Sequence, residues 1–282
     1  MTVLPPGSEE LIARAFSEDI GDGDHTSLST IPADAKGAAR LLVKADGVLA
    51  GVEMAQAVTA YFDPAITLRI YLEDGAAVKE GDIAFNLMGP TRSILQVERI
   101  LLNFMQRMSG IATLTHRFVD AVEGTGCRVL DTRKTTPGLR AIEKWAVRLG
   151  GGHNHRMGLY DMIMIKDNHH DFAGGIPKAI QAARAYLAST GKDLPIEVET
   201  RDLDEVEQVL ATGGVQRIML DNFTPKLMRQ AVERIDRRYE TEASGGITLA
   251  TARSFAETGV DFISVGALTH SVPSLDLSLK AL

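Results

Sequence analysis

The fold is decided by three stretches in the second half of the chain: Ile196-Glu-Val-Glu-Thr200, Met219-Leu-Asp-Asn222 and Glu242-Ala-Ser-Gly-Gly-Ile247. In each, a short strand-like run ends in carboxylate, amide or hydroxyl side chains. The same pattern recurs in Val129-Leu-Asp-Thr-Arg-Lys-Thr135, Met164-Ile-Lys-Asp-Asn-His169 and Ser264-Val-Gly-Ala-Leu-Thr-His270. We therefore predict six strands that begin near residues 128, 162, 196, 217, 240 and 262, each with polar groups at its carboxyl end.

The segments between these strands have helical patterns, for example residues 176–187, 203–211, 224–235 and 249–257. Regular alternation of strands and helices indicates a parallel sheet. In a β/α barrel the carboxyl ends of all strands converge on one face, whereas a doubly wound sheet collects functional residues mainly at one switch point. Functional groups at six consecutive strand ends therefore favour the barrel.

The first half of the chain does not show this regular alternation of strands and helices. A short helix is predicted from about residue 8 to 17, followed by an acidic, glycine-rich loop over 18–27. Residues 37–88 read as short strands separated by Asp-Gly and Gly-Asp turns, with a helix over 52–62. Apolar residues three or four apart then predict a long, core-facing helix from 91 to about 122. This half is a small α+β unit.

Two other readings of this half remain open. Asp22 and Asp24 have the spacing of a calcium loop, but Ala33 occupies the twelfth loop position, where glutamate is required. A capped turn is the simpler reading of that loop. The turns at Gly47 and 75–81 resemble those of a lipoyl or biotinyl carrier, but Lys44 has no clear hairpin-tip position and a carrier leaves the second half unexplained.

Composition limits the function class. The chain has 282 residues, of which 45% are hydrophobic and 24% charged, so a folded chain of one or two domains is expected. The net charge of -7 disfavours binding to long nucleic acids. No signal peptide and no run of ~18 apolar residues is visible, so secretion and a membrane location are not expected. The single cysteine, Cys127, fits a reducing cytoplasm.

Two glycine-containing turns follow the last two predicted strands, Ser244-Gly-Gly-Ile-Thr248 and Gly266-Ala-Leu-Thr-His270. Backbone N–H groups at such strand-to-helix turns bind phosphate, and barrels often place a phosphate site after their final strands. Alone, Ser-Gly-Gly is an ordinary tight turn. Its position in the series indicates a phosphate ligand.

Glu199 and Asp221 end neighbouring strands, so their carboxylates are expected to face the same mouth. Two oxygen ligands with room for water and phosphate suit Mg²⁺. The alternative is that one of them forms a structural salt bridge with Lys166.

Cationic side chains gather at the same strand ends. They are Arg133, Lys134, His155, Arg156 and Lys166, with Arg107 and Arg140 as further candidates. So many cations require anions, and arginine is preferred where carboxylates or phosphates are gripped by two parallel hydrogen bonds.

Other chemistry is less well supported. His153, His155, His169 and His170 could suggest zinc, but no cysteine or acidic residue is spaced to complete a tetrahedral set. Cys127 reads as a small core residue rather than a nucleophile. Packing roles are expected for Trp145, Met162 and Met164.

Taken together, these motifs resemble the quinolinate phosphoribosyltransferase family, the decarboxylating nicotinate-nucleotide pyrophosphorylases of NAD biosynthesis. The resemblance runs through nearly the whole chain in order. The segments that carry it are Gly21-Asp-Gly-Asp-His-Thr-Ser27, Gln106-Arg-Met-Ser-Gly-Ile-Ala-Thr113, Asp131-Thr-Arg-Lys-Thr-Thr-Pro-Gly-Leu-Arg140, Gly151-Gly-His-Asn-His-Arg-Met-Gly-Leu159, Lys166-Asp-Asn-His169, Glu197-Val-Glu199, Leu220-Asp-Asn222, Glu242-Ala-Ser-Gly-Gly-Ile247 and Ser264-Val-Gly-Ala-Leu-Thr-His-Ser271.

The resemblance implies a type II phosphoribosyltransferase architecture. An N-terminal α/β sandwich domain would cover residues 1–112, an incomplete β/α (TIM-like) barrel would cover 113–273, and residues 274–282 would pack with the sandwich. It also implies a homodimer with active sites shared between the two chains.

The family reaction would convert quinolinate and phosphoribosyl pyrophosphate (PRPP) to nicotinate mononucleotide, pyrophosphate and carbon dioxide, with Mg²⁺ as cofactor. By motif, Arg133, His155, Arg156 and Lys166 would hold the quinolinate carboxylates, with Arg107 reaching in from the neighbouring chain. The residues around PRPP and its metal would be Lys134, Glu199, Asp221, Ser244, Gly245, Gly246, Gly266 and His270. Lys134, Lys166, Glu199 and Asp221 are the expected catalytic residues, and Glu199 and Asp221 the metal ligands.

Two alternatives to this function remain. A paralogue could transfer phosphoribose to another aromatic carboxylate while keeping the phosphate site. A non-catalytic protein could bind an anionic metabolite without releasing pyrophosphate, although the Glu199 and Asp221 pair argues against it.

Overall fold

The computed structural model describes residues 4–282, which form two compact units that interleave along the chain. The first unit contains residues 4–116, 135–151 and 268–282, and the second contains residues 117–134 and 152–267. The chain therefore passes between the units four times. Within the described residues, no helix is long and apolar enough to cross a membrane.

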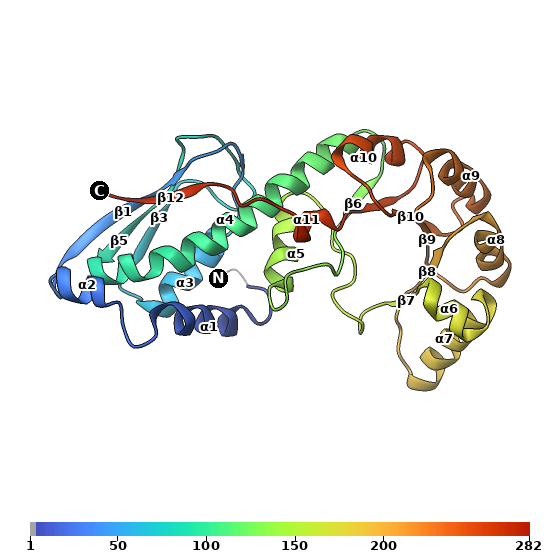
Figure 1. Ribbon diagram of the computed structural model, residues 1–282, viewed down its shortest axis with the longest axis horizontal. Helices are drawn as coiled ribbons and strands as arrows, with labels where there is room; N and C mark the ends of the chain where they lie inside the picture. The colour runs from blue at the N-terminus through green and yellow to red at the C-terminus, as the bar shows by residue number, and fades with distance from the viewer. Residues whose placement is uncertain (1–3) are drawn as a thin grey trace. The chain divides into compact units, whose positions relative to one another are not determined.

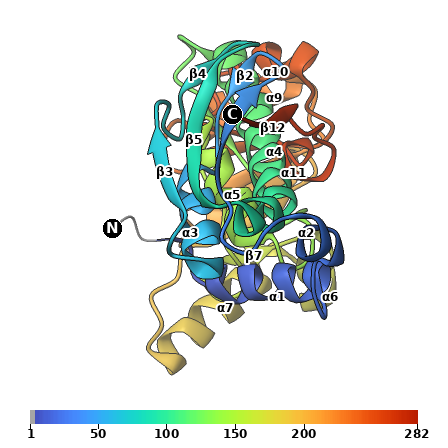
Figure 2. The ribbon, with the colours of Figure 1, turned by 90° about the vertical axis from the view of Figure 1, so that its left-hand side faces the viewer.

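The first unit contains a four-stranded antiparallel sheet in the order β12-β1-β5-β3 (Figures 1 and 2). A two-stranded ribbon, β2 with β4, lies outside this sheet. The strands are β1 (Lys36–Val43), β2 (Gly47–Val48), β3 (Thr67–Ile70), β4 (Ala77–Val78), β5 (Ile83–Pro90) and β12 (Leu277–Ala281). Alternate residues of β1 and β5, such as Leu41 and Phe85, are fully buried, which is the period-two pattern of a sheet with one core face.

Five helices begin in the first unit: α1 (Ser8–Ile20), α2 (His25–Thr30), α3 (Val52–Phe62), α4 (Thr91–Val122) and α5 (Arg140–Leu149). The predicted helices over 52–62 and 91–122 are confirmed at both ends. The first helix is three residues longer than predicted. The acidic loop after it is a helix cap, because the Asp24 carboxylate accepts the Ser27 N–H at 3.0 Å and begins α2.

Helix α4 is buried along one stripe, where Val97, Leu101, Met105, Met108 and Ile111 have no exposed surface. This spacing of three and four residues is the pattern from which the helix was predicted. The final strand, β12, pairs with β1 from Ala39↔Ala281 to Val43↔Leu277. The last residues of the chain therefore complete the sheet that its first strand begins.

The second unit contains six parallel strands in the order β6-β11-β10-β9-β8-β7. They are β6 (Arg128–Leu130), β7 (Ile163–Ile165), β8 (Ile196–Thr200), β9 (Arg217–Asp221), β10 (Glu240–Ser244) and β11 (Phe262–Ser264). All six predicted strands are present and begin within one residue of the predicted positions. In the part of the chain that the structure describes, β6 and β7 stand at opposite ends of this sheet without pairing, as expected of an incomplete barrel.

Helices connect these strands and cover the outside of the curved sheet (Figure 1). They are α6 (Asp167–Ala173), α7 (Ile176–Thr190), α8 (Leu203–Thr212), α9 (Pro225–Ile235) and α10 (Leu249–Ala256), and α11 (Ala267–His270) follows β11. Side chains two residues apart on β8, β9 and β10 point to the inside of the barrel, because successive side chains alternate between the faces of a strand. The carboxyl ends of these strands therefore present Glu199, Asp221 and Ser244 on one side.

The C-terminal segment packs closely against α4 at Gly110. A Cβ atom at this position would overlap the carbonyl oxygen of Pro273. We expect Gly110→Ala to lower the free energy of unfolding by about 1–3 kcal/mol, measured by urea denaturation. At a helical position with free space, the same change raises the free energy of unfolding by about 1 kcal/mol. A stabilised Gly110→Ala variant would therefore show that Pro273 does not pack tightly against α4.

Candidate active site

The candidate site lies at the carboxyl ends of the parallel strands of the second unit. Lys166 follows β7, Glu199 lies near the end of β8, Asp221 ends β9 and Ser244 ends β10. Arg133 and Lys134 follow β6, and Gly266 follows β11. Of the residues predicted from sequence, the second unit therefore contains Arg133, Lys134, His155, Arg156, Lys166, Glu199, Asp221, Ser244, Gly245, Gly246 and Gly266, whereas Arg107 and His270 belong to the first unit.

The two acids at the mouth have different surroundings. Glu199 is 7% exposed, and its Oε2 lies 3.3 Å from the Nζ of Lys166. The salt bridge considered as the alternative role of these residues is thus present. Asp221 is half-buried, and its Oδ2 accepts a hydrogen bond from the Asn222 amide at 2.6 Å. Both acids offer hard carboxylate oxygens at the same edge of the sheet.

A turn with two left-handed glycines follows β10. Gly245 has φ +102° and Gly246 has φ +61°, and a Cβ on Gly245 would overlap the Asn222 side-chain oxygen. The Asn222 N–H also donates to the Ser244 carbonyl at 2.8 Å. This contact and the positive φ require glycine at position 245. The sequence motif included Asn222, but its role in packing against Gly245 was not predicted.

Arg156 is held in place by its neighbours. The guanidinium donates to the Met162 carbonyl at 3.2 Å and contacts the Met164 sulfur at 3.5 Å, so Met164 does more than pack. Burial, together with the nearby positive charge of Arg133, lowers the pKa of Arg156. Two guanidinium groups that repel each other in a partly desolvated place form a site that favours an anion.

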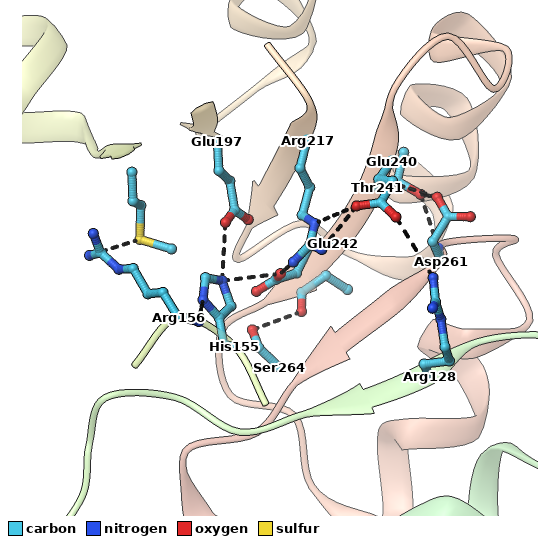
Figure 3. A network of polar contacts seen from close by, with 12 residues as sticks. Arg128, His155, Arg156, Glu197, Arg217, Glu240, Thr241, Glu242, Asp261 and Ser264 are labelled. Carbon is cyan, nitrogen blue, oxygen red and sulfur yellow. Dashed lines mark hydrogen bonds and ion pairs between the residues drawn. The ribbon is translucent and has the colours of Figure 1, made fainter. Parts of the chain in front are cut away.

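His155 faces away from this charge pair and into the barrel. Its Nε2 lies 3.0 Å from Glu197 and 3.4 Å from Glu242, and the ring is almost completely buried (Figure 3). The ring Nδ1 accepts the Arg156 backbone N–H at 2.7 Å, which places a ring proton on Nε2. Burial lowers the pKa of His155, but the carboxylates of Glu197 and Glu242 outweigh it and raise this pKa to about 9. The predicted role of His155 at the quinolinate carboxylates stays a prediction, because the structure engages both ring nitrogens within the chain.

The carboxylates beneath His155 were not identified as site residues from the sequence. Glu197 precedes Glu199 by two residues on β8, and Glu242 lies two residues before Ser244 on β10, so strand alternation was the available signal. Arg217 neutralises Glu242, with Nη1 2.9 Å from its carboxylate. Burial and the neighbouring Glu242 raise the pKa of Glu197 to about 7. Burial alone would raise the pKa of Glu242, but His155 and Arg217 lower it.

Within residues 4–282, His155, Glu197 and Glu242 are also the one group of three side chains placed closely enough to share a metal ion. Arg217 already supplies a positive charge there. Its guanidinium lies 4.2 Å from the centre of the Phe262 ring and contacts Glu240 at 2.9 Å. Arg128 lies 4.1 Å from the centre of the same ring and 3.7 Å from the Glu240 carboxylate.

Arg107 is anchored within the first unit. Its Nη2 lies 2.7 Å from the Glu143 carboxylate, which is completely buried, and it also donates to the Thr269 carbonyl. Glu143 was not predicted from sequence, because the α5 helix that carries it was not recognised. Cys127 is buried, and burial raises the pKa of its thiol to about 12, in agreement with a core role.

Comparisons with known proteins give consistent results. Residues 24–109 match the model of the quinolinate phosphoribosyl transferase N-terminal domain, and residues 111–280 match that of its C-terminal domain. Quinolinate phosphoribosyltransferase [decarboxylating] 2b, mitochondrial, from Nicotiana tabacum is 46% identical over 99% of this chain and 85% of its own length. The probable nicotinate-nucleotide pyrophosphorylase [carboxylating] of Bacillus subtilis is 42% identical over 96% of this chain and 92% of its own.

A solved structure gives the same result for the fold. NadC from Streptococcus pyogenes superposes with a TM-score of 0.94 at 39% identity, covering all of both chains. The mixed α/β architecture with a parallel barrel sheet is therefore that of the type II phosphoribosyltransferases, as predicted.

The raised pKa of Glu197 gives a prediction for the pH dependence of stability. Because the folded-state pKa lies above the unfolded value, ionisation of Glu197 opposes folding, and stability is lost as the pH rises through about 7. Between pH 5 and pH 8, wild type should lose about 2 kcal/mol of unfolding free energy relative to Glu197→Gln, whose side chain cannot ionise. Urea denaturation of both proteins across this range measures the difference. Parallel pH profiles for the two proteins would contradict it.

Proposed function

Because the chain belongs to the quinolinate phosphoribosyltransferase family, we propose that it transfers the phosphoribosyl group of PRPP to quinolinate. The products are nicotinate mononucleotide, pyrophosphate and carbon dioxide, in the biosynthesis of NAD. Both substrates are small anions, in agreement with the cationic strand ends. The observation that carries the assignment at the site is the set of cationic side chains at the carboxyl ends of β6 and β7, where Arg133, Lys134 and Lys166 follow the strands.

In this proposal Arg133 and Arg156 grip the two carboxylates of quinolinate, and Lys166 and His155 complete the clamp. Arginine presents two parallel N–H donors that match a planar carboxylate, which a lysine cannot do. Lys166 is exposed and reaches the mouth from the end of β7, where Glu199 holds it. An incoming anion can share this ammonium with Glu199.

The phosphate groups of PRPP are assigned to the opposite strand ends. Gly246 is exposed, and no atom lies within 4 Å of the place where its Cβ would be, so a phosphate can approach the backbone of this turn. Gly266, Lys134 and His270 are the other residues proposed to surround PRPP. A glycine turn before a helix suits phosphate through its unsatisfied donors and the helix dipole.

We propose Mg²⁺ as the cofactor. The donor set fits this ion, because Glu199 and Asp221 supply two hard oxygen ligands and the substrate can supply others. Both side chains would hold the metal, and their present partners, Lys166 and Asn222, are groups that can reorient. When bound, the ion would neutralise charge on pyrophosphate.

The chain's own residues position the reactants and stabilise charge. As pyrophosphate leaves, the ribosyl carbon gains oxocarbenium character, which the carboxylates of Glu199 and Asp221 stabilise by their field. The pyridine nitrogen of quinolinate, held by the clamp, then forms the new C–N bond. The ring nitrogen is now cationic and stabilises the electron pair that stays on the neighbouring ring carbon when the carboxylate departs as carbon dioxide. A proton from solvent then bonds to that carbon. The electron sink is in the substrate, so positioning is the main task of the protein.

We also propose that two copies form a homodimer in which Arg107 acts in the partner's site. Arg107 is supported by the buried Glu143, which fixes the Nε and Nη2 edge of the guanidinium. The single, buried Cys127 is compatible with a reducing compartment, and we propose the cytoplasm.

The proposed function is tested by mixing the protein with quinolinate, PRPP and Mg²⁺ and measuring pyrophosphate and carbon dioxide. We expect both products in equal amounts, and far slower pyrophosphate release when nicotinate, which has one carboxylate, replaces quinolinate. Omission of Mg²⁺ should abolish turnover. Preferential use of nicotinate would indicate a different acceptor, and PRPP binding without turnover would indicate a binding protein.

Replacement of either clamp arginine tests the acceptor site. Leaving a buried carboxylate without its charged partner costs about 2–5 kcal/mol, so Arg133→Ala and Arg156→Ala should raise the quinolinate KM by tens to thousands of fold. The KM for PRPP should change far less, as steady-state kinetics with each substrate varied will show. A quinolinate KM within threefold of wild type for both variants would remove these arginines from the clamp.

Complementation tests the shared site. Arg107→Ala and Lys134→Ala proteins should each be nearly inactive alone. A mixed dimer contains one site that has both an intact Lys134 and an intact Arg107 from its partner. Unfolding, mixing and refolding makes about half of the dimers mixed, so activity should return to about a quarter of wild type. Absence of recovery, with mixed dimers confirmed by mass, shows that Arg107 serves its own chain.

A further inference from the structure

The barrel contains a layer of charges beneath the candidate site that the proposed reaction does not use. Glu197 and Glu242 are completely buried, and Arg217 is largely buried beside them (Figure 3). Buried ionic groups are costly unless they are paired, and burial alone gives no reason to place two carboxylates there. The cost of burying these charges therefore indicates that the layer has a role in the protein.

The layer connects to the site through the ring of His155. Glu242 has Arg217 as its principal partner at 2.9 Å, whereas Glu197 faces His155 Nε2 at 3.0 Å. Neither oxygen of Glu197 accepts a hydrogen bond within the described residues 4–282, so its 3.0 Å approach to Nε2 is an ion-pair contact. The carboxylate of Glu197 thus faces one edge of the imidazole and favours a proton on Nε2.

The other edge of the ring holds the backbone of Arg156. Its Nδ1 accepts the backbone N–H of Arg156 at 2.7 Å. The backbone N–H of His155 donates to the Asp131 carboxylate at 2.9 Å. Two successive backbone N–H groups are therefore fixed by side chains from different elements. A ring that turned over would present its Cδ2–H to the Arg156 backbone N–H, and a ring with the other tautomer would present an N–H. In either case the start of the Arg156 side chain would move.

We infer that Glu197, supported by Glu242 and Arg217, is a positioning residue for the quinolinate clamp. It fixes the orientation and tautomer of His155, which in turn aims Arg156 at the carboxylate of the acceptor. The inference rests on the proposed function. On this inference, the buried layer affects how tightly the protein binds the aromatic dicarboxylate. The residues at the strand ends determine how tightly it binds PRPP.

Kinetics of purified full-length variants test the inference. Glu197→Met keeps the length of the side chain but removes the acceptor, and Glu197→Gln keeps a neutral acceptor. Glu240→Gln is the matched control, since Glu240 contacts Arg217 at 2.9 Å from the outer end of β10 and is not in contact with His155. Glu197→Met should raise the quinolinate KM by about tenfold or more, as loss of a supporting partner usually does. Glu197→Gln should restore most of this loss, and Glu240→Gln should match wild type.

The KM for PRPP separates positioning from general damage to the fold. It should stay within twofold of wild type in all three variants. Equal rises in both KM values, or a quinolinate KM unchanged in Glu197→Met, would overturn the inference. If Glu197→Met does not fold, Glu242→Gln replaces it under the same criteria, because this change removes the charge that supports His155 from the other side.

A measurement without substrate keeps the inference separate from the proposed function. The ¹⁵N signals of the His155 ring report which nitrogen carries the proton, and can be assigned by their loss in His155→Asn. The spectra are recorded above pH 9, where the His155 ring is neutral. A proton-free Nδ1 is then expected in wild type and in Glu240→Gln, with a shift toward the other tautomer in Glu197→Met. A protonated Nδ1 in wild type at this pH would overturn the inference even if the enzyme turns over, whereas a wild type that fails to use quinolinate contradicts the proposed function alone.

Discussion

The second unit depends on one constraint, which is that the charges placed inside its barrel must neutralise each other. Arg217 lies against the ring of Phe262 and reaches both Glu240 and Glu242. Without this guanidinium, the buried Glu242 would lie beside the buried Glu197 with His155 as their shared cationic partner. Because removing one partner of a buried pair is more costly than the pair is stabilising, Glu242 and Arg217 depend on each other, whereas Glu240 is exposed to solvent.

Strand alternation arranges these charges in layers. On β10, Glu240, Glu242 and Ser244 point to the same side and follow one another from the closed end of the barrel to its mouth. On β9 the corresponding positions are Arg217, Met219 and Asp221. The parallel pairing of β9 with β10 places Asp221 opposite Ser244. A stabilising layer, a supporting layer and a ligand-binding layer are thus built on the same short strands.

Much of this architecture could be predicted from the sequence. Each strand of the second unit was predicted from a short run followed by polar residues, and α4 from its apolar spacing, because these signals are local. The α5 helix and the assignment of residues 135–151 to the first unit were not predicted, since both depend on contacts between distant segments. Glu197 and Glu242 were visible as alternating positions, but a buried carboxylate becomes plausible only when the strand register brings Arg217 and His155 to it. The packing of Asn222 against Gly245 likewise requires two turns that lie 20 residues or more apart in sequence.

The pairing of β12 with β1 has a consequence for synthesis of the chain. A ribosome makes β1 well before β12, so one side of β1 has no partner until residues 277–281 leave the exit tunnel. An open strand edge is a template for pairing with other chains. The second unit, whose strands all lie between residues 128 and 264, has no such delay. The sheet of the first unit therefore cannot be completed until all strands of the second unit have been made.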